Sequence, residues 1–138
     1  MSRVVIDASA GVEIVLNTRR GQALAKLVPG GAEAWVPEHF TVEVLGGVRR
    51  RLLVERVITE DQANEARERL RRWHLRQASV PPLADAAWKL RHNISMADAV
   101  YVVLAEHLGA PLLTDDHRLI GAPTFPRDVA VLSLPKPA

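Results

Sequence analysis

The sequence predicts an α/β protein in which a mostly parallel central sheet of four to five strands lies between two layers of helices. Short apolar runs alternate with helical patterns along the whole chain, as parallel strands joined by helices require. The first run, Val4–Ile6, has no polar alternation, which is typical of a strand covered on both faces. A single three-layer α/β/α domain of 138 residues would bury about two-thirds of its unfolded surface, which is enough core to fold without disulfide bonds or a structural metal ion.

The first strand ends abruptly at Asp7. Ser9 is expected to cap the helix that follows, because a serine oxygen can accept from the first free amides of a helix. A second short helix is predicted over Arg20–Val28, and Pro29-Gly30-Gly31 should stop it. These elements leave Asp7 at the carboxyl end of the first strand, the edge at which open α/β sheets hold their ligands.

The middle of the chain is predicted to form a helical hairpin. After a brief strand at Ala34–Pro37, apolar residues recur every four positions and indicate a long helix over Glu38–Glu55. The pattern Thr59-Glu60-Asp61-Gln62 is a capping box that opens a further helix with one apolar face and one densely charged face. These two helices should form the hairpin.

The last part of the chain continues the alternation of strands and helices. Ser95 should cap a helix that runs to Leu108 and stops at Gly109, since glycine readily takes the left-handed conformation at a helix end. The other expected elements are a strand at Ala78–Val80, a helix over Leu83–Arg91, a strand at Leu112–Thr114, a turn or short helix near Arg118–Ile120 and a last strand at Val129–Leu132.

The composition excludes several classes of site. There is no cysteine, so disulfides, thiolate metal sites and cysteine nucleophiles are excluded. No apolar run reaches the roughly 18 residues of a membrane span and no signal peptide opens the chain, so we expect a cytoplasmic protein. Fifteen of the 18 basic residues are arginine, which fits an acidic or nucleic-acid partner and fits a GC-rich genome equally well. Aromatic residues make up only 4%, so nucleic acid would be held mainly by its phosphates.

Four acidic residues stand where a parallel sheet would bring them to one edge. Asp7 and Asp116 follow strands. Glu43 lies early in its helix, and Asp98 comes three residues after the cap Ser95. Two carboxylates about 4 Å apart repel by about 4 kcal/mol at an effective dielectric near 20, so such a cluster implies raised pKa values or a bound divalent cation. Oxygen ligands without cysteine point to Mg²⁺ or Mn²⁺.

Each acid also has an ordinary structural explanation. Asp98 could be the carboxylate at the third helical position of a capping box, favoured by the helix dipole. Asp115 and Asp116 could be turn residues that cap the following helix, and Glu43 could be solvated. Asp7 is the hardest to explain in this way, because an acid directly after an apolar strand has no partner nearby in the sequence.

Two hydroxyl residues accompany the acids. Ser9 and Thr114 are most simply explained as helix caps or strand-end hydroxyls. They could also hydrogen-bond a water on a metal ion, so we include them as supporting residues of the site.

At these residues the sequence resembles a PIN-domain ribonuclease, and most of all the VapC toxins of bacterial toxin–antitoxin pairs. The resemblance covers nearly the whole chain and rests on four segments in a specific order and spacing: Val5–Ala10, Val42–Leu45, Arg91–Glu106 and Leu112–Leu119. This chain departs from the family pattern at two positions, and both bear on how the substrate fits more than on the chemistry of the acids. Relatives often carry an aromatic residue where this chain has Ala97, and asparagine where it has Gly46.

The resemblance implies a Mg²⁺- or Mn²⁺-dependent endoribonuclease, the toxin of a type II toxin–antitoxin pair. We expect residues 1–134 to form a single PIN-like domain and residues 135–138 to form a tail. The resemblance also implies a homodimer that cuts RNA and is inhibited by a cognate VapB-like antitoxin, whose C-terminal segment would lie across the active-site groove.

The resemblance assigns the family's acidic quartet to four residues of this chain: Asp7, Glu43, Asp98 and Asp116. Asp7 and Asp98 are expected to be the main metal ligands, with Asp116 assisting. Glu43 would orient or deprotonate the attacking water.

Two functions of other classes stay open at this point. A phosphotransfer domain with Asp7 as phosphoacceptor would need a lysine near a strand end, and Lys26, Lys89 and Lys136 fall elsewhere. A non-catalytic interaction module would use the helical hairpin as a dimer or partner surface. Addition of Mn²⁺ separates the last case from a nuclease, because a metal that binds the folded state stabilises it.

Overall fold

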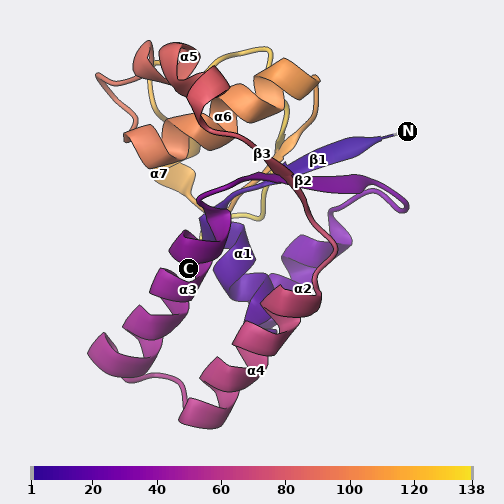
Figure 1. The fold of residues 1–138 in the computed structure, drawn as a ribbon, viewed down its shortest axis with the longest axis vertical. Coiled ribbons are helices and arrows are strands. Elements are labelled where there is room, and N and C mark those ends of the chain that lie inside the picture. Colours follow the sequence, from indigo (N-terminus) through magenta and orange to yellow (C-terminus); the bar gives the residue numbers. More distant parts are fainter. Residues whose placement is uncertain (1, 138) are drawn as a thin grey trace.

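The structure, a computed structural model, describes residues 2–137. Met1 and Ala138, at the ends of the predicted domain and tail, lie outside the described residues. The described residues form one sheet of five parallel strands in the order β3-β2-β1-β4-β5, which confirms the predicted parallel sheet. Figure 1 labels three of these strands, β1, β2 and β3. The strands are β1 Arg3–Ile6, β2 Glu33–Pro37, β3 Arg76–Ala78, β4 Leu112–Leu113 and β5 Val131–Leu132.

β1 lies in the middle of the sheet because its backbone pairs on both sides. Val5 lies opposite Trp35 of β2 and opposite Leu112 of β4. The three residues Val4–Ile6 are at most 1% exposed, which confirms a strand covered on both faces. Asp7 therefore leaves the sheet at its carboxyl edge, between the ends of the two neighbouring strands.

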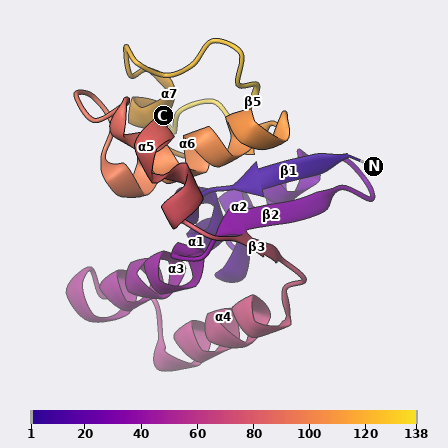
Figure 2. The same cartoon turned by 45° about the horizontal axis from the view of Figure 1, so that its top comes forward.

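Helices cover both faces of the sheet and make the predicted three-layer architecture (Figure 2). On one face lie α1 (Ala8–Val15), α2 (Arg19–Lys26), α3 (Phe40–Arg49) and α4 (Glu60–Arg72). On the other lie α5 (Ala84–Trp88), α6 (Met96–Leu108) and α7 (His117–Ile120). A π-helical turn, η1 (Arg50–Val54), extends α3, and a 3₁₀ turn, η2 (Pro81–Leu83), precedes α5.

Two glycines let the neighbouring helices pack closely against α1. A Cβ atom on Gly21 would collide with the backbone carbonyl of Glu13, and one on Gly47 would lie 2.5 Å from the Val12 side chain. A larger residue at either position would push α2 or α3 away from α1. This packing fixes the start of α1, and with it Asp7, against the sheet.

The expected helical hairpin is formed by α3, η1 and α4, which project away from the sheet (Figure 1). Thr59 opens α4 with the predicted capping box. The long helix predicted over 38–55 begins only at Phe40, because the Glu38 amide still follows the strand ladder and donates to the Ala78 carbonyl at 2.9 Å.

Other predicted bounds are wrong at particular residues. Ser9 does not cap α1; Asp7 does, because its carboxylate accepts from the Ala10 amide at 3.0 Å. β3 begins and ends two residues before the predicted strand Ala78–Val80, since the chain turns there into two prolines. The helix predicted over 83–91 is shortened to α5: the two prolines form a 3₁₀ turn in front of it, and it ends at Trp88.

The helix α6 agrees with its prediction. The Ser95 hydroxyl accepts from the Asp98 amide at 3.2 Å, and Gly109 ends the helix in the left-handed conformation with φ of 60°. Most of this helix is buried against the sheet. No helix within residues 2–137 is both long and apolar enough to cross a membrane.

Candidate active site

Asp7 lies at the centre of the candidate site and is only 2% exposed. Its Oδ1 accepts from the Ala10 amide at 3.0 Å and from the Ser9 hydroxyl at 2.7 Å, while the Thr114 hydroxyl donates to Oδ2. Burial raises the pKa of Asp7 to about 6, even though these hydrogen bonds lower it and the charge of Asp98 adds to the rise. A bound cation would relieve the cost of holding this buried carboxylate charged.

The hydroxyls of Ser9 and Thr114 connect Asp7 to the loop that follows β4. The Ser9 oxygen accepts from the Asp115 amide at 2.9 Å, and the Thr114 oxygen accepts from the Asp116 amide at 3.0 Å. The two hydroxyl oxygens lie 3.3 Å apart. Both therefore fix the distance between the ends of two neighbouring strands, in addition to supporting the Asp7 carboxylate.

Asp98 and Asp116 face one another across a hollow of about 250 Å³ that Ser95 and Arg118 also line. Burial raises the pKa of Asp98, and repulsion from Asp116 and Glu43 adds to this rise. Asp116 caps α7 through the Arg118 and Leu119 amides at 3.0 and 3.1 Å. The ordinary capping explanation thus holds for Asp116, but the electrostatic coupling places it with the other acids as well.

Glu43 is held by two side chains that sequence reasoning missed. The Tyr101 hydroxyl donates to Glu43 Oε1 at 2.7 Å, and His39 Nε2 lies 3.4 Å from the same oxygen. Tyr101 is fully buried. Burial raises the pKa of Tyr101, and the hydrogen bond to Glu43 and the charges of Asp7 and Asp98 raise it further.

A signal for Tyr101 is present in the sequence. It follows Asp98 by three residues, so both lie on the same face of α6. His39 gives no comparable signal, because only the fold brings its ring beside that of Tyr101, with the ring centroids 4.9 Å apart.

The four acids are close enough to influence one another but do not form a ready metal cage. Within residues 2–137, no group of three or more acidic or histidine side chains is gathered as tightly as a metal ion requires. The chemistry of the donors fits Mg²⁺ or Mn²⁺, because all are carboxylates and the pKa values of Asp7 and Asp98 stay raised despite their hydrogen bonds. The acidic side chains would have to move toward one another to bind the ion.

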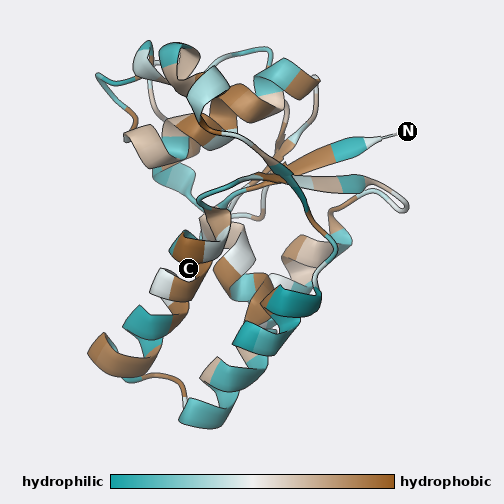
Figure 3. Ribbon diagram, in the orientation of Figure 1, coloured by the Kyte–Doolittle hydropathy of each residue, from teal (hydrophilic) through white to brown (hydrophobic). Residues whose placement is uncertain are grey.

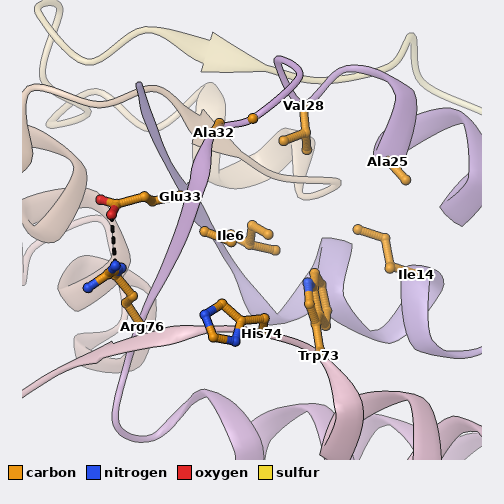
Figure 4. A pocket seen from close by; sticks show the side chains of 11 residues that line it. Ile6, Ile14, Ala25, Val28, Ala32, Glu33, Trp73, His74 and Arg76 are labelled. Atoms are coloured by element: carbon orange, nitrogen blue, oxygen red, sulfur yellow. Dashed lines mark ion pairs between the residues drawn. The ribbon is translucent and has the colours of Figure 1, made fainter. Parts of the chain in front are cut away.

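A larger hollow of about 590 Å³ lies between the sheet and the helices α1 and α2 (Figure 4). Its walls are mainly apolar, with Ile6, Ile14 and Trp73 among them. An ion pair at its rim joins Glu33 to Arg76 at 3.0 Å. None of the four predicted site acids lines this hollow.

Comparisons with known proteins show which family this chain matches. The PIN domain family matches residues 4–123. Ribonuclease VapC12 of Mycobacterium tuberculosis is 39% identical over 121 residues, covering 84% of this chain and 88% of its own length. Ribonuclease VapC1 of the same organism is 33% identical over 135 residues, covering 96% of this chain and 99% of its own length.

A solved structure has the same fold. The crystal structure of M. tuberculosis VapC20, described as a Sarcin-Ricin loop cleaving toxin, matches with a TM-score of 0.60 at 19% identity. It covers 83% of this chain and 90% of that one. The chain therefore belongs to the PIN-domain family. The relatives it matches within that family are VapC-type ribonucleases.

Proposed function

We propose that this protein is a Mg²⁺- or Mn²⁺-dependent endoribonuclease and the toxin of a type II toxin–antitoxin pair. The observation that carries the proposal is the buried Asp7 carboxylate at the carboxyl edge of the sheet, which burial and the nearby charge of Asp98 bring to a pKa of about 6. Holding this buried carboxylate charged costs stability, and a bound cation would offset that cost. The VapC ribonucleases that match most of the chain support the same conclusion.

In this proposal Asp7, Asp98 and Asp116 hold the ion. A divalent cation there would supply Lewis-acid stabilisation of the charge that develops on an RNA phosphodiester. Both side-chain contacts of Glu43, from Tyr101 and from His39, are to Oε1. Its Oε2 can therefore orient the attacking water and accept its proton.

Partners follow from the family and from apolar residues of the hairpin that are exposed to solvent. Figure 3 colours the ribbon by hydropathy and shows hydrophobic segments along α3 and the turn after it. Five such residues lie on α3, at its end or just beyond it: Val42, Leu45, Leu53, Val54 and Val57. Apolar surface of this kind is typical of a protein–protein contact. We propose that the protein works in the cytoplasm as a homodimer and is inhibited by a VapB-like antitoxin that covers the groove beside the acids.

The test is RNA cleavage by the purified protein with Mg²⁺, with Mn²⁺ and with a chelator. Cleavage should need the metal and should disappear in Asp7→Asn and in Asp98→Asn. The control is Asp85→Asn, which removes an exposed carboxylate of α5 and should leave cleavage unchanged. Cleavage that continues in the chelator, or that survives in Asp7→Asn, would exclude the proposed mechanism.

The same samples separate a nuclease from an interaction module. If the hairpin were the whole function, Mn²⁺ would not stabilise the fold and no RNA would be cut. If the proposal holds, Mn²⁺ should raise the melting temperature of the wild type and leave that of Asp98→Asn unchanged.

A further inference from the structure

Arg20 of α2 reaches across to the loop that carries Asp116. Its Nε lies 2.9 Å from both carboxylate oxygens of Asp115, and its Nη2 lies 2.7 Å from Oδ1 of the same residue. The two side chains are only 25% and 13% exposed, so water screens this ion pair less than it screens the pairs on α4. Because two nitrogens of the guanidinium contact the carboxylate, this ion pair fixes the orientation of the Asp115 side chain as well as its distance from Arg20.

Asp115 is held at its backbone too. Its amide donates to the Ser9 hydroxyl at 2.9 Å, and the next amide, that of Asp116, donates to the Thr114 hydroxyl at 3.0 Å. Ser9 and Thr114 are the two hydroxyls that hold Asp7. The contact with Arg20 is therefore the third anchor of a loop that joins Asp116 to Asp7.

The contact also neutralises a charge. Without Arg20, the Asp115 carboxylate would add a fifth negative charge beside an acidic cluster that already repels itself. With it, Asp115 is turned toward α2, and Asp116 is the acid of this loop that lines the hollow with Asp98.

The C-terminal segment joins the same contact. Nη2 of Arg20 donates to the Pro135 carbonyl at 2.9 Å. The segment reaches this position because β5 pairs with β4, placing Leu132 opposite Leu113. Pro135 lies beyond residues 4–123, the part that the PIN domain family matches.

We infer that Arg20 is a positioning residue that fixes the Asp115–Asp116 loop relative to Asp7, and that the C-terminal segment completes its binding through Pro135. The consequence for catalysis rests on the proposed function, whereas the consequence for the loop does not. Lysine cannot replace arginine here, because a single ammonium group lacks the fork that contacts Asp115 and Pro135 together.

The first test is amide hydrogen exchange of the metal-free protein, followed by NMR. In Arg20→Lys, the Asp115 and Asp116 amides should exchange about tenfold faster than in the wild type, since local opening controls their protection. Arg19→Lys is the matched control, because Arg19 is the exposed neighbour on the same helix and should change nothing. Unchanged exchange at both amides in a folded Arg20→Lys protein would overturn the inference.

Further variants keep the test decisive. Asp115→Asn removes the charge from the other side, and its effect on exchange should not add to that of Arg20→Lys in the double variant. Removal of residues 135–138 should speed the exchange of the same amides, whereas removal of 136–138 should not. Additive effects, or equal effects of the two truncations, would contradict the shared anchor.

Activity gives the second readout. If Arg20 acts through Asp116, Arg20→Lys should lower kcat about ten- to a hundredfold with KM for RNA unchanged, since a small misplacement near the reacting atoms is costly. If exchange is faster in Arg20→Lys but the wild type cuts no RNA, the proposed function is rejected and the loop anchor is kept. Asp7-dependent cleavage with unchanged exchange would reject the anchor alone.

Discussion

Replacing Asp7 by asparagine should make the metal-free protein more stable while it abolishes activity. Burial raises the pKa of Asp7 from its ordinary 3.8 to about 6. Above pH 6 the folded protein holds a charge that the unfolded chain would carry more cheaply, and a difference of two pKa units corresponds to about 3 kcal/mol. Asparagine keeps the shape, can still accept from the Ala10 amide and can still cap the helix, but its Nδ2 cannot accept from the Thr114 hydroxyl as Oδ2 of Asp7 does, which offsets part of the gain. The free energy of unfolding should therefore rise by up to this amount.

The sign of the effect fixes its pH dependence. A carboxyl whose pKa is raised by folding destabilises the protein above its folded pKa, and this cost disappears as the pH falls to the unfolded value. The stability difference between Asp7→Asn and the wild type should thus be largest above about pH 6 and vanish near pH 4. The difference between the two proteins cancels the titration of groups that do not interact with Asp7, and it reports Asp7 together with its coupling to Asp98.

Urea unfolding in a chelator, at several pH values across this window, measures the difference directly. Asp85→Asn, at an exposed position of α5, is the matched control and should show no pH-dependent gain. A variant Asp7→Asn that is less stable than the wild type at about pH 7.5 would refute the reasoning, because the charge at Asp7 would then contribute stability to the fold.

Other changes test the surroundings of Asp7. Tyr101→Phe should lower kcat about tenfold with KM unchanged, because Glu43 loses its hydrogen-bond donor; wild-type kcat in steady-state cleavage would contradict this role. Mn²⁺ at about 100 times its Kd should raise the free energy of unfolding by about 2.7 kcal/mol, and the same rise in Asp98→Asn would place the ion elsewhere. Gly21→Ala should lower the free energy of unfolding by about 1–3 kcal/mol, because the new methyl group meets the neighbouring helix backbone. Urea unfolding should show little change in the control Gly30→Ala, which has open space around it; equal losses would contradict the packing explanation.

Much of the fold could be predicted from local patterns. The apolar run before Asp7 indicated a central strand, and the parallel arrangement that followed put the ends of β1 and β4 side by side. The caps at Thr59 and Ser95 can be predicted, because capping depends on residues three apart in the sequence. The cap predicted at Ser9 is wrong, since both Ser9 and Asp7 can cap a helix and only the structure shows which oxygen faces the free amide.

The contacts that hold the acids could not be predicted. Tyr101 and Glu43 are 58 residues apart, and Arg20 and Asp115 are 95 apart. Such pairs depend on how the helices are placed against the sheet, which neither periodicity nor composition determines. The acids themselves were recognisable because each stands at a strand end or a helix start, whereas their partners lie at ordinary helical positions.

The most direct test of the proposed metal site is the anomalous X-ray signal of Mn²⁺ bound to crystals of the protein. The result we expect is one or more Mn²⁺ peaks bounded by the carboxylates of Asp7, Asp98 and Asp116, and their loss in Asp98→Asn. Saturating Mn²⁺ that gives no peak between these carboxylates, or a peak only at another surface, would contradict the proposed metal-dependent nuclease.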